Sequence, residues 1–292
     1  MKTRMKRCIT AAVAVLSATT AITIGTASSS VAQATGLRAF GITADGTLMA
    51  TFTTDRPQVL DWVRLVTGLS GDTALIGIDF RVQNNTMYGV GNYGGIYTIT
   101  TPVITTPPSN TDVIVKKVSQ LGVPLYGTNF GVDFNPAADR LRVVSDNGQN
   151  LRHNLNDGTT VEDTTLTTPP LTGPARGVTA SAYTNNDLNA DTATTLFGVN
   201  TTTDQVVIQS PANNGTLAPT GALGLDAGPN AGLDIYSDLV NGKTVSATAF
   251  ATLVPAGGSA TLYSVNLLTG ATTNAGQLPL PITDLALALD SY

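Results

Sequence analysis

The 292-residue sequence carries 15 basic and 20 acidic residues, and its net charge of −5 disfavours nucleic acid and anionic membranes as partners. It contains one cysteine (Cys8), one histidine (His153) and one glutamate (Glu162). An internal disulfide is therefore impossible, and a zinc site built from cysteines and histidines is disfavoured.

Residues 1–34 have the regions of a secretory signal peptide in the expected order. Four basic residues lie among the first seven, a mostly apolar run covers 9–24, and the segment ends with Ala32-Gln33-Ala34. Small residues at these last positions suit a signal peptidase. The apolar run is too short and too polar for a membrane span of about 20 residues. We therefore expect cleavage after Ala34, no transmembrane anchor, and a location outside the cell or in the periplasm.

Residues 35–292 are predicted to form one domain. Without the leader and its four basic residues, 11 basic and 20 acidic residues remain, so the net charge is −9 and no cysteine is left. A chain of this length buries enough apolar surface to fold without disulfides. We expect it to be a monomer.

A short unit, Gly-x-Asp between apolar residues, recurs about every 50 residues in the mature chain. The copies are 77–80, 131–134, 232–235 and a looser 282–285, and Ala182 takes the aspartate position in a further copy at 181–183. Other β-branched segments follow each copy, with Asn-Gly, Asp-Gly and Pro-rich turns between them. Three or four strands in about 50 residues are typical of a propeller blade.

The two ends of the mature chain complement each other. Segment 37–52 lacks the Gly-x-Asp strand, whereas 282–289 consists of that strand alone. The prediction is an all-β fold, a single β-propeller of about five blades, closed by pairing of its N- and C-terminal strands so that no sheet edge stays open. A pair of β-sandwiches is the alternative, because short regular strands fit both architectures.

Several segments resemble the bacterial family called domain of unknown function 4394 (DUF4394). They are 130–136, 139–152, 182–186, 195–199 and 211–217. The resemblance implies a secreted, propeller-like protein. It implies no reaction, so no catalytic residue is carried over.

The repeated aspartates are the first candidate binding residues: Asp79, Asp133, Asp234 and Asp284. On the innermost strands of a propeller, they would offer oxygen ligands for calcium around the central channel. We favour a structural role instead, in which each carboxylate accepts backbone N–H bonds or pairs with an arginine of the next blade.

A predicted hairpin supplies the second candidate site. Asp146-Asn147-Gly148 suits a three-residue loop, which sets Arg142 opposite Arg152 and Arg140 opposite Asn154. The three guanidiniums then share one sheet face, where they either bind an anionic ligand or pair with the repeated aspartates.

We favour pairing, and expect both Arg142 and Arg152 to contact Asp79 or Asp133. His153 falls on the opposite, apolar face of the hairpin and is expected to be a core residue.

The third candidate is the sequence Asp187-Leu188-Asn189-Ala190-Asp191, whose D-x-N-x-D spacing resembles that of a calcium loop. Thr192 replaces the usual glycine, and Gly198 stands where an acidic residue belongs. The loop therefore either binds calcium through Asp187, Asn189 and Asp191 or is a solvated turn.

Two functions remain open. The favoured one is a non-enzymatic binding or scaffold module, whose partner is an unknown ligand or envelope component. The alternative is a propeller hydrolase, lactonase-like or phosphatase-like, that uses calcium and carboxylates. The scarcity of histidine and glutamate favours the first, but propellers host both kinds. Calcium is the only cofactor that the sequence suggests.

Overall fold

The computed structural model describes residues 36–105 and 110–290, so the predicted leader lies outside the described residues. All described residues belong to one compact unit, Ala34–Tyr292. They form twenty strands and one short 3-10 turn, η1 (Ala212–Asn214). The all-β prediction is confirmed for this part of the chain.

The strands form one eight-stranded sheet and three four-stranded sheets. The eight-stranded sheet runs, in spatial order, β20 (Ile282–Leu287), β1 (Arg38–Thr43), β2 (Leu48–Thr53), β3 (Trp62–Thr67), β7 (Val113–Gln120), β6 (Gly95–Thr100), β5 (Thr86–Gly91) and β4 (Leu75–Arg81). The second sheet contains β8 (Phe130–Asn135), β9 (Arg140–Ser145), β10 (Asn150–His153) and β11 (Thr160–Glu162).

The third sheet contains β12 (Val178–Tyr183), β13 (Leu196–Asn200), β14 (Gln205–Gln209) and β15 (Leu217–Ala222). The fourth contains β16 (Ala227–Val240), β17 (Lys243–Pro255), β18 (Thr261–Val265) and β19 (Thr272–Gln277). Apart from β20 and β1, antiparallel neighbours in all four sheets follow one another along the chain, as the alternating turns and β-branched runs predict.

The strands that carry the Gly-x-Asp repeat lie at sheet edges and contact one another. The order of contact is β20, β4, β8, β12 and β16, and β16 in turn contacts β20. This closed sequence of contacts makes the fold propeller-like. It also brings the aspartates of four different strands towards one another.

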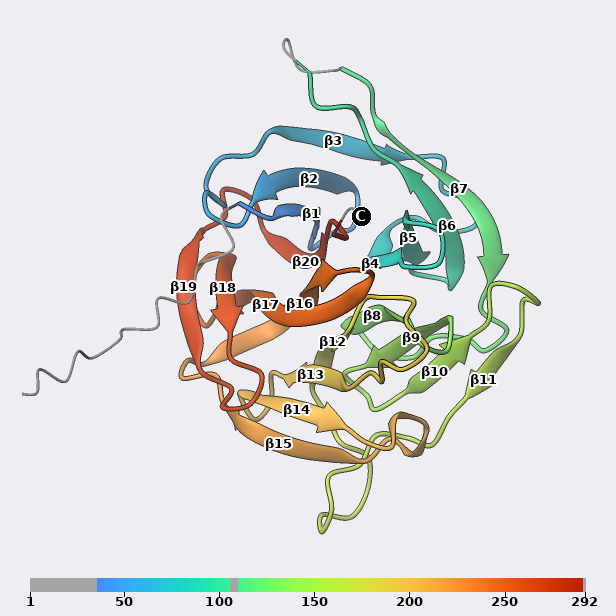
Figure 1. The fold of residues 1–292 in the computed structure, drawn as a ribbon, viewed down its shortest axis with the longest axis vertical. Coiled ribbons are helices and arrows are strands. Elements are labelled where there is room, and N and C mark those ends of the chain that lie inside the picture. Colours follow the sequence, from blue (N-terminus) through green and yellow to red (C-terminus); the bar gives the residue numbers. More distant parts are fainter. Residues whose placement is uncertain (1–35, 106–109, 291–292) are drawn as a thin grey trace, which may run out of the picture. The chain divides into compact units, whose positions relative to one another are not determined.

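The ends of the described chain pair in one sheet, as predicted. β1 lies beside β20 (Figure 1). The two strands are antiparallel, with Ala39 opposite Leu287 and Gly41 opposite Leu285. The backbone bond from Ala288 N to Arg38 O extends this pairing by one step. The predicted closure between 37–52 and 282–289 is therefore confirmed.

The strands do not divide into five separate sheets. β3 and β7 pair in parallel at Val66–Val113 and Thr67–Ile114, which joins two groups of four strands into one sheet. Such pairing satisfies backbone groups that would otherwise be exposed along two outer edges. The sheet count alone thus does not give the predicted number of blades.

The apolar core lies between neighbouring sheets. One hydrophobic cluster joins Ile42 and Met49 to Ile78 and Tyr97, and another joins strands β4–β6 to β8–β10. Along β7, Val113 and Val115 are buried while the intervening Ile114 is exposed, which is the period of two expected for a strand with one buried face.

Candidate functional site

The four repeated aspartates are buried on the contacting edge strands. Asp79 lies on β4, Asp133 on β8, Asp234 on β16 and Asp284 on β20. In three of the four copies a glycine two residues earlier permits the close approach: a Cβ on Gly131 would lie 2.6 Å from backbone atoms of Ala180 and Ser181. The repeat therefore combines close strand contact with a carboxylate that reaches the neighbouring backbone.

Each aspartate accepts a hydrogen bond from the backbone of a neighbouring edge strand. The bonds run from Phe134 N to Asp79 (2.7 Å), from Tyr183 N to Asp133 (2.9 Å), from Leu287 N to Asp234 (2.6 Å) and from Ile78 N to Asp284 (2.8 Å). A carboxylate–backbone hydrogen bond thus connects the two strands at four of the five contacts between edge strands. Of the two structural roles predicted for the aspartates, these bonds confirm the first, acceptance of backbone N–H groups. None of the four bonds involves an arginine, which was the other predicted partner.

The contact between β12 and β16 is the exception. Ala182 stands where the other copies have aspartate, and it is completely buried. Here Asn186 connects the strands instead, because its backbone N–H donates to Ser237 Oγ at 2.9 Å and its side-chain amide donates to Ile235 O at 3.1 Å. An amide side chain from the following loop therefore replaces the missing carboxylate.

Three of the carboxylates converge. One oxygen each from Asp79, Asp133 and Asp234 lies within 4.8 Å of the others. Burial raises the pKa of Asp79, Asp133 and Asp284 well above the ordinary range, and repulsion from the neighbouring carboxylates raises it further. Burial raises the pKa of Asp234 to about 6. We call these four residues the carboxylate cluster.

A small hollow opens beside the cluster, where the edge strands begin. Its volume is about 70 Å³, and it is lined by Asp284, Thr179, Phe130 and Ala231, among others. This volume accommodates a few water molecules or a hydrated ion. It is far below the roughly 300–1,000 Å³ of a typical organic-ligand pocket.

Three buried hydroxyls near these strands have no hydrogen-bond partner among the described residues: Thr179 Oγ1, Ser181 Oγ and Thr252 Oγ1. The side chain of Thr179 is 1 % exposed and lines the hollow with Asp284. Thr252 Oγ1 and Asp284 Oδ1 lie 2.8 and 2.9 Å from the point where Gly232 would carry a Cβ, so both face the same small space. Buried hydroxyls without partners are costly and mark places where a further polar group fits.

The arginine hairpin has the predicted register. Arg142 lies opposite Arg152 in the β9–β10 pair, and the apolar Leu151 lies opposite Val143. Arg140 does not join them, because its Nη1 donates to the carbonyls of Ala138 and Asp139. Asp146 accepts a bond from Thr128 N at 2.9 Å.

Arg142 and Arg152 both contact a carboxylate, as predicted, but the partner is Asp163. Arg142 Nη1 lies 2.7 Å from Asp163 Oδ2, and Arg152 binds both Asp163 oxygens at 3.0 Å. The predicted partners, Asp79 and Asp133, were wrong because their carboxylates accept backbone N–H groups of the next edge strand. Extending the β10–β11 register by one step would have placed Asp163 opposite Asn150, beside both arginines.

Arg142 is only 2 % exposed and is held by further polar side chains. It donates to Asn150 and Asn213 at 2.7 Å each and to the Tyr183 hydroxyl at 3.3 Å. Its guanidinium therefore connects the second and third sheets. This arrangement holds the arginine as a structural group with its donors engaged, not as a free anion-binding group.

A protein-family model confirms the family resemblance seen in the hairpin segment 139–152 and in the other segments. The model described as "Domain of unknown function (DUF4394)" matches residues 48–286, which include the carboxylate cluster and both arginines. This chain belongs to the DUF4394 family. No curated protein matches the sequence.

Solved structures similar to this DUF4394 chain share little sequence with it. A Bacteroides thetaiotaomicron protein of unknown function has 12 % identity and a TM-score of 0.47, covering 87 % of this chain and 67 % of its own. A chain of a nidogen/laminin complex has 11 % identity and a TM-score of 0.47, with coverage of 88 % and 100 %. Hydrazine synthase of Kuenenia stuttgartiensis has 10 % identity and a TM-score of 0.38, covering 71 % of this chain, which spans about half of that protein's length (51 %).

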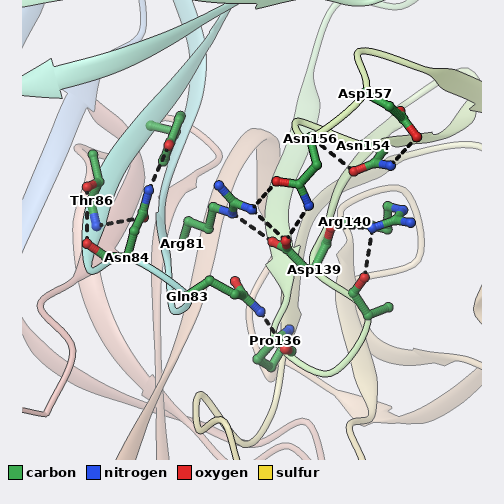
Figure 2. A network of polar contacts seen from close by, with 12 residues as sticks. Arg81, Gln83, Asn84, Thr86, Pro136, Asp139, Arg140, Asn154, Asn156 and Asp157 are labelled. Atoms are coloured by element: carbon green, nitrogen blue, oxygen red, sulfur yellow. Dashed lines mark hydrogen bonds and ion pairs between the residues drawn. The ribbon is translucent and has the colours of Figure 1, made fainter.

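The DUF4394 chain also has a polar network between β4 and the β8–β9 turn that sequence reasoning missed. Arg81 Nε donates to Asp139 at 2.7 Å, and Asn156 bridges the pair (Figure 2). Gln83 donates to Pro136 O at 2.7 Å. Asp139 has a left-handed backbone (φ 52°), and its carboxylate joins two sheets. Arg81 and Asp139 are 58 residues apart in the sequence, and no sequence pattern indicated that they meet.

In the D-x-N-x-D loop of this DUF4394 chain, the side chains of Asp187 and Asn189 accept hydrogen bonds from the protein itself. Asp187 accepts bonds from Asn189 N at 2.9 Å and from the Thr244 backbone and hydroxyl at 2.9 and 2.6 Å. Asn189 accepts one from Asp191 N. These bonds support the turn interpretation, in which Asp187 fastens the loop to the β16–β17 hairpin.

His153 is completely buried, as expected of a core residue. Its ring nitrogens lie 2.9 Å from Ser119 Oγ and 2.8 Å from Thr160 Oγ1. Burial lowers the pKa of this imidazole. Among the described residues, no helix has the length and apolar character needed to cross a membrane.

Proposed function

We propose that this DUF4394 protein is a secreted, non-enzymatic scaffold or binding module, built as a five-bladed propeller. Five edge strands contact one another in a closed order, and each leads outward into three further strands. β3 and β7 share only two residue pairs, so we count the eight-stranded sheet as two blades that touch at their outer strands. The predicted signal peptide supports export, with an envelope component or extracellular ligand as the partner.

The observation that best supports the proposal is that the buried carboxylates are hydrogen-bonded to the backbone of neighbouring strands. All four accept backbone N–H groups from neighbouring edge strands, so they stabilise the contacts between blades. A carboxylate used in this way satisfies a buried donor that would otherwise cost about 1–3 kcal/mol. The residues that most resemble catalytic acids thus have a structural task.

A hydrolase is less well supported by the same geometry. The hollow beside the cluster holds about 70 Å³, which is too small for an organic ester or phosphate. The only histidine lies on β10, and its two ring nitrogens lie within hydrogen-bond distance of hydroxyls. General base catalysis at the cluster would therefore depend on the carboxylates alone.

The structural role is tested by comparing Asp133→Ala with Asp133→Asn. Both substitutions remove the charge, but only asparagine keeps an acceptor for Tyr183 N. In urea unfolding with a chelator present, we expect the alanine variant to be less stable than the asparagine variant by about 1–3 kcal/mol. Equal stabilities would contradict the proposal that Asp133 stabilises the fold by accepting the hydrogen bond from Tyr183 N.

The absence of catalysis is tested with lactone, carboxylic ester and phosphate monoester substrates, with and without calcium. The purified mature protein should give only the background rate of hydrolysis. Turnover that disappears in Asp133→Asn and Asp79→Asn, while both variants remain folded, would overturn the scaffold proposal in favour of the hydrolase.

A further inference from the structure

We propose that the carboxylate cluster binds one calcium ion, with Asp79, Asp133 and Asp234 as its protein ligands. Their three nearest oxygens lie within 4.8 Å of one another. Two oxygens that bind the same calcium at about 2.4 Å can be up to about 4.8 Å apart, so these separations are compatible with a shared ion. The ion is structural and goes beyond the scaffold function, which does not require it.

The carboxylates of the cluster favour a cation when they are deprotonated. Asp79, Asp133, Asp234 and Asp284 are between 3 and 7 % exposed, and none of the ion pairs found in the described part of the chain involves them. Like charges buried together repel, and the backbone donors that they accept are neutral. A divalent cation would offset the repulsion without displacing those bonds, because a carboxylate oxygen has two lone pairs.

The unpartnered hydroxyls point independently to a missing polar ligand. Thr252 Oγ1 is completely buried and shares with Asp284 Oδ1 the space above Gly232. Thr179 Oγ1, 1 % exposed, lines the hollow into which Asp284 also faces. Waters bound to an ion at the cluster would satisfy both hydroxyls, since buried polar groups without protein partners commonly bind ordered water.

The hollow beside Asp284 has room for ordered water, which would supply the remaining ligands. It lies where the edge strands begin, and its volume of about 70 Å³ accommodates a few waters. Calcium takes six to eight oxygen ligands in a flexible geometry, so three carboxylates and several waters are a suitable set. Magnesium demands a near-ideal octahedron, which three carboxylates already fixed by backbone bonds do not provide.

The test uses the mature protein, residues 35–292, freed of metal with a chelator. Calcium chloride is then titrated calorimetrically, and the melting temperature is recorded with calcium, with magnesium and with chelator. We expect one calcium per chain and a higher melting temperature in calcium than in magnesium. Elemental analysis of protein purified without chelator should give the same stoichiometry.

Two isosteric variants identify the site. Asp133→Asn keeps the acceptor for Tyr183 N but removes one ligand charge, and should weaken calcium affinity by about tenfold or more. Asp191→Asn, at an exposed position of the D-x-N-x-D loop, is the matched control and should bind like the wild type. If Asp133→Asn does not fold, Asp79→Asn takes its place.

Three results would overturn the proposal. They are no calcium binding by folded wild-type protein, binding unchanged in the cluster variant, or binding lost in Asp191→Asn, which would place the ion in the loop. None of these results would contradict the scaffold function, which fails only if substrate is turned over or if the Ala and Asn variants of Asp133 are equally stable.

Discussion

Asp284 accepts a 2.8 Å hydrogen bond from the backbone N–H of Ile78, a residue 206 positions earlier in the sequence. The carboxylate lies on β20, the last strand, and the N–H on β4. β20 also pairs with β1, so this bond connects the closing strand to a second neighbour, the edge strand β4. β20 therefore stabilises contacts on two sides, which makes it a sensitive place for truncation.

Deleting the chain from Pro281 onward should strongly destabilise the protein. The deletion exposes the edge of β1, removes the acceptor for Ile78 N, and takes away the apolar Leu285 and Leu287. We expect the melting temperature to fall by about 10 °C or more and aggregation to increase. A chain that ends at Asp290 is the control. A truncated monomer that melts within a degree or two of this control would contradict the closed propeller.

Replacing Asp163 by asparagine should leave two arginines without their carboxylate. Arg142 is 2 % exposed, so its charge would remain buried and uncompensated. We expect a loss of about 3–5 kcal/mol in the free energy of unfolding, measured in urea. The exposed Asp112→Asn is the control and should change stability by less than about 0.5 kcal/mol. A small effect of Asp163→Asn would mean that the polar partners of Arg142 suffice.

Ala182, which stands where the other copies have aspartate, allows a test of how many buried carboxylates the fold tolerates. Ala182→Asp would restore the repeat but add a fifth carboxylate to the cluster, whereas Ala182→Asn adds the same volume without charge. In chelator at pH 7, the aspartate variant should be less stable than the asparagine variant by several kcal/mol. The difference should shrink towards pH 4, where the added acid is protonated. A more stable aspartate variant would show that β12 tolerates the charge.

Stability should depend on His153 between pH 7 and pH 5. Burial lowers the pKa of its imidazole in the folded protein, so the unfolded chain takes up a proton first as the pH falls below about 6.5. The contribution of the neutral ring is complete above that pH and is lost below it. Unfolding free energies of the wild type and His153→Gln, measured at both pH values, should show a steeper loss in the wild type. Parallel losses would mean that His153 does not set the slope.

Mass spectrometry of the culture supernatant should find a protein that starts at Thr35. Ala32 and Ala34 provide the small residues that a signal peptidase requires. Ala34→Phe should block processing and leave the precursor with the cells. An exported protein that still carries Met1 to Ala34 would contradict the predicted cleavage.

The parts of the fold that follow from local periodicity were visible in the sequence. The Gly-x-Asp copies lie on the contacting edge strands, because only a residue as small as glycine allows β8 to approach the backbone at Ala180. The Asn-Gly and Asp-Gly turns delimit hairpins, which fixed the register of Arg142 and Arg152. The incomplete first and last units together implied the pairing of β1 with β20.

What the sequence did not reveal depends on contacts outside the repeat. Asp163, the partner of both arginines, lies just after β11 and has no counterpart in the other units. The pairing of β3 with β7 joins strands that are separated along the chain by three others. The meeting of Arg81 with Asp139 depends on how two sheets pack (Figure 2). Such contacts are set by tertiary packing, which local propensity does not encode.

The first strand and the last strand are neighbours, and this has a consequence for the time course of folding. A growing chain contains β1 long before it contains β20, so β1 lacks one of its two partners until residues 282–287 have been synthesised. Contacts between residues so distant in sequence form slowly, because a long loop must first close. A nascent fragment that ends before β20 therefore cannot complete the eight-stranded sheet that contains β1.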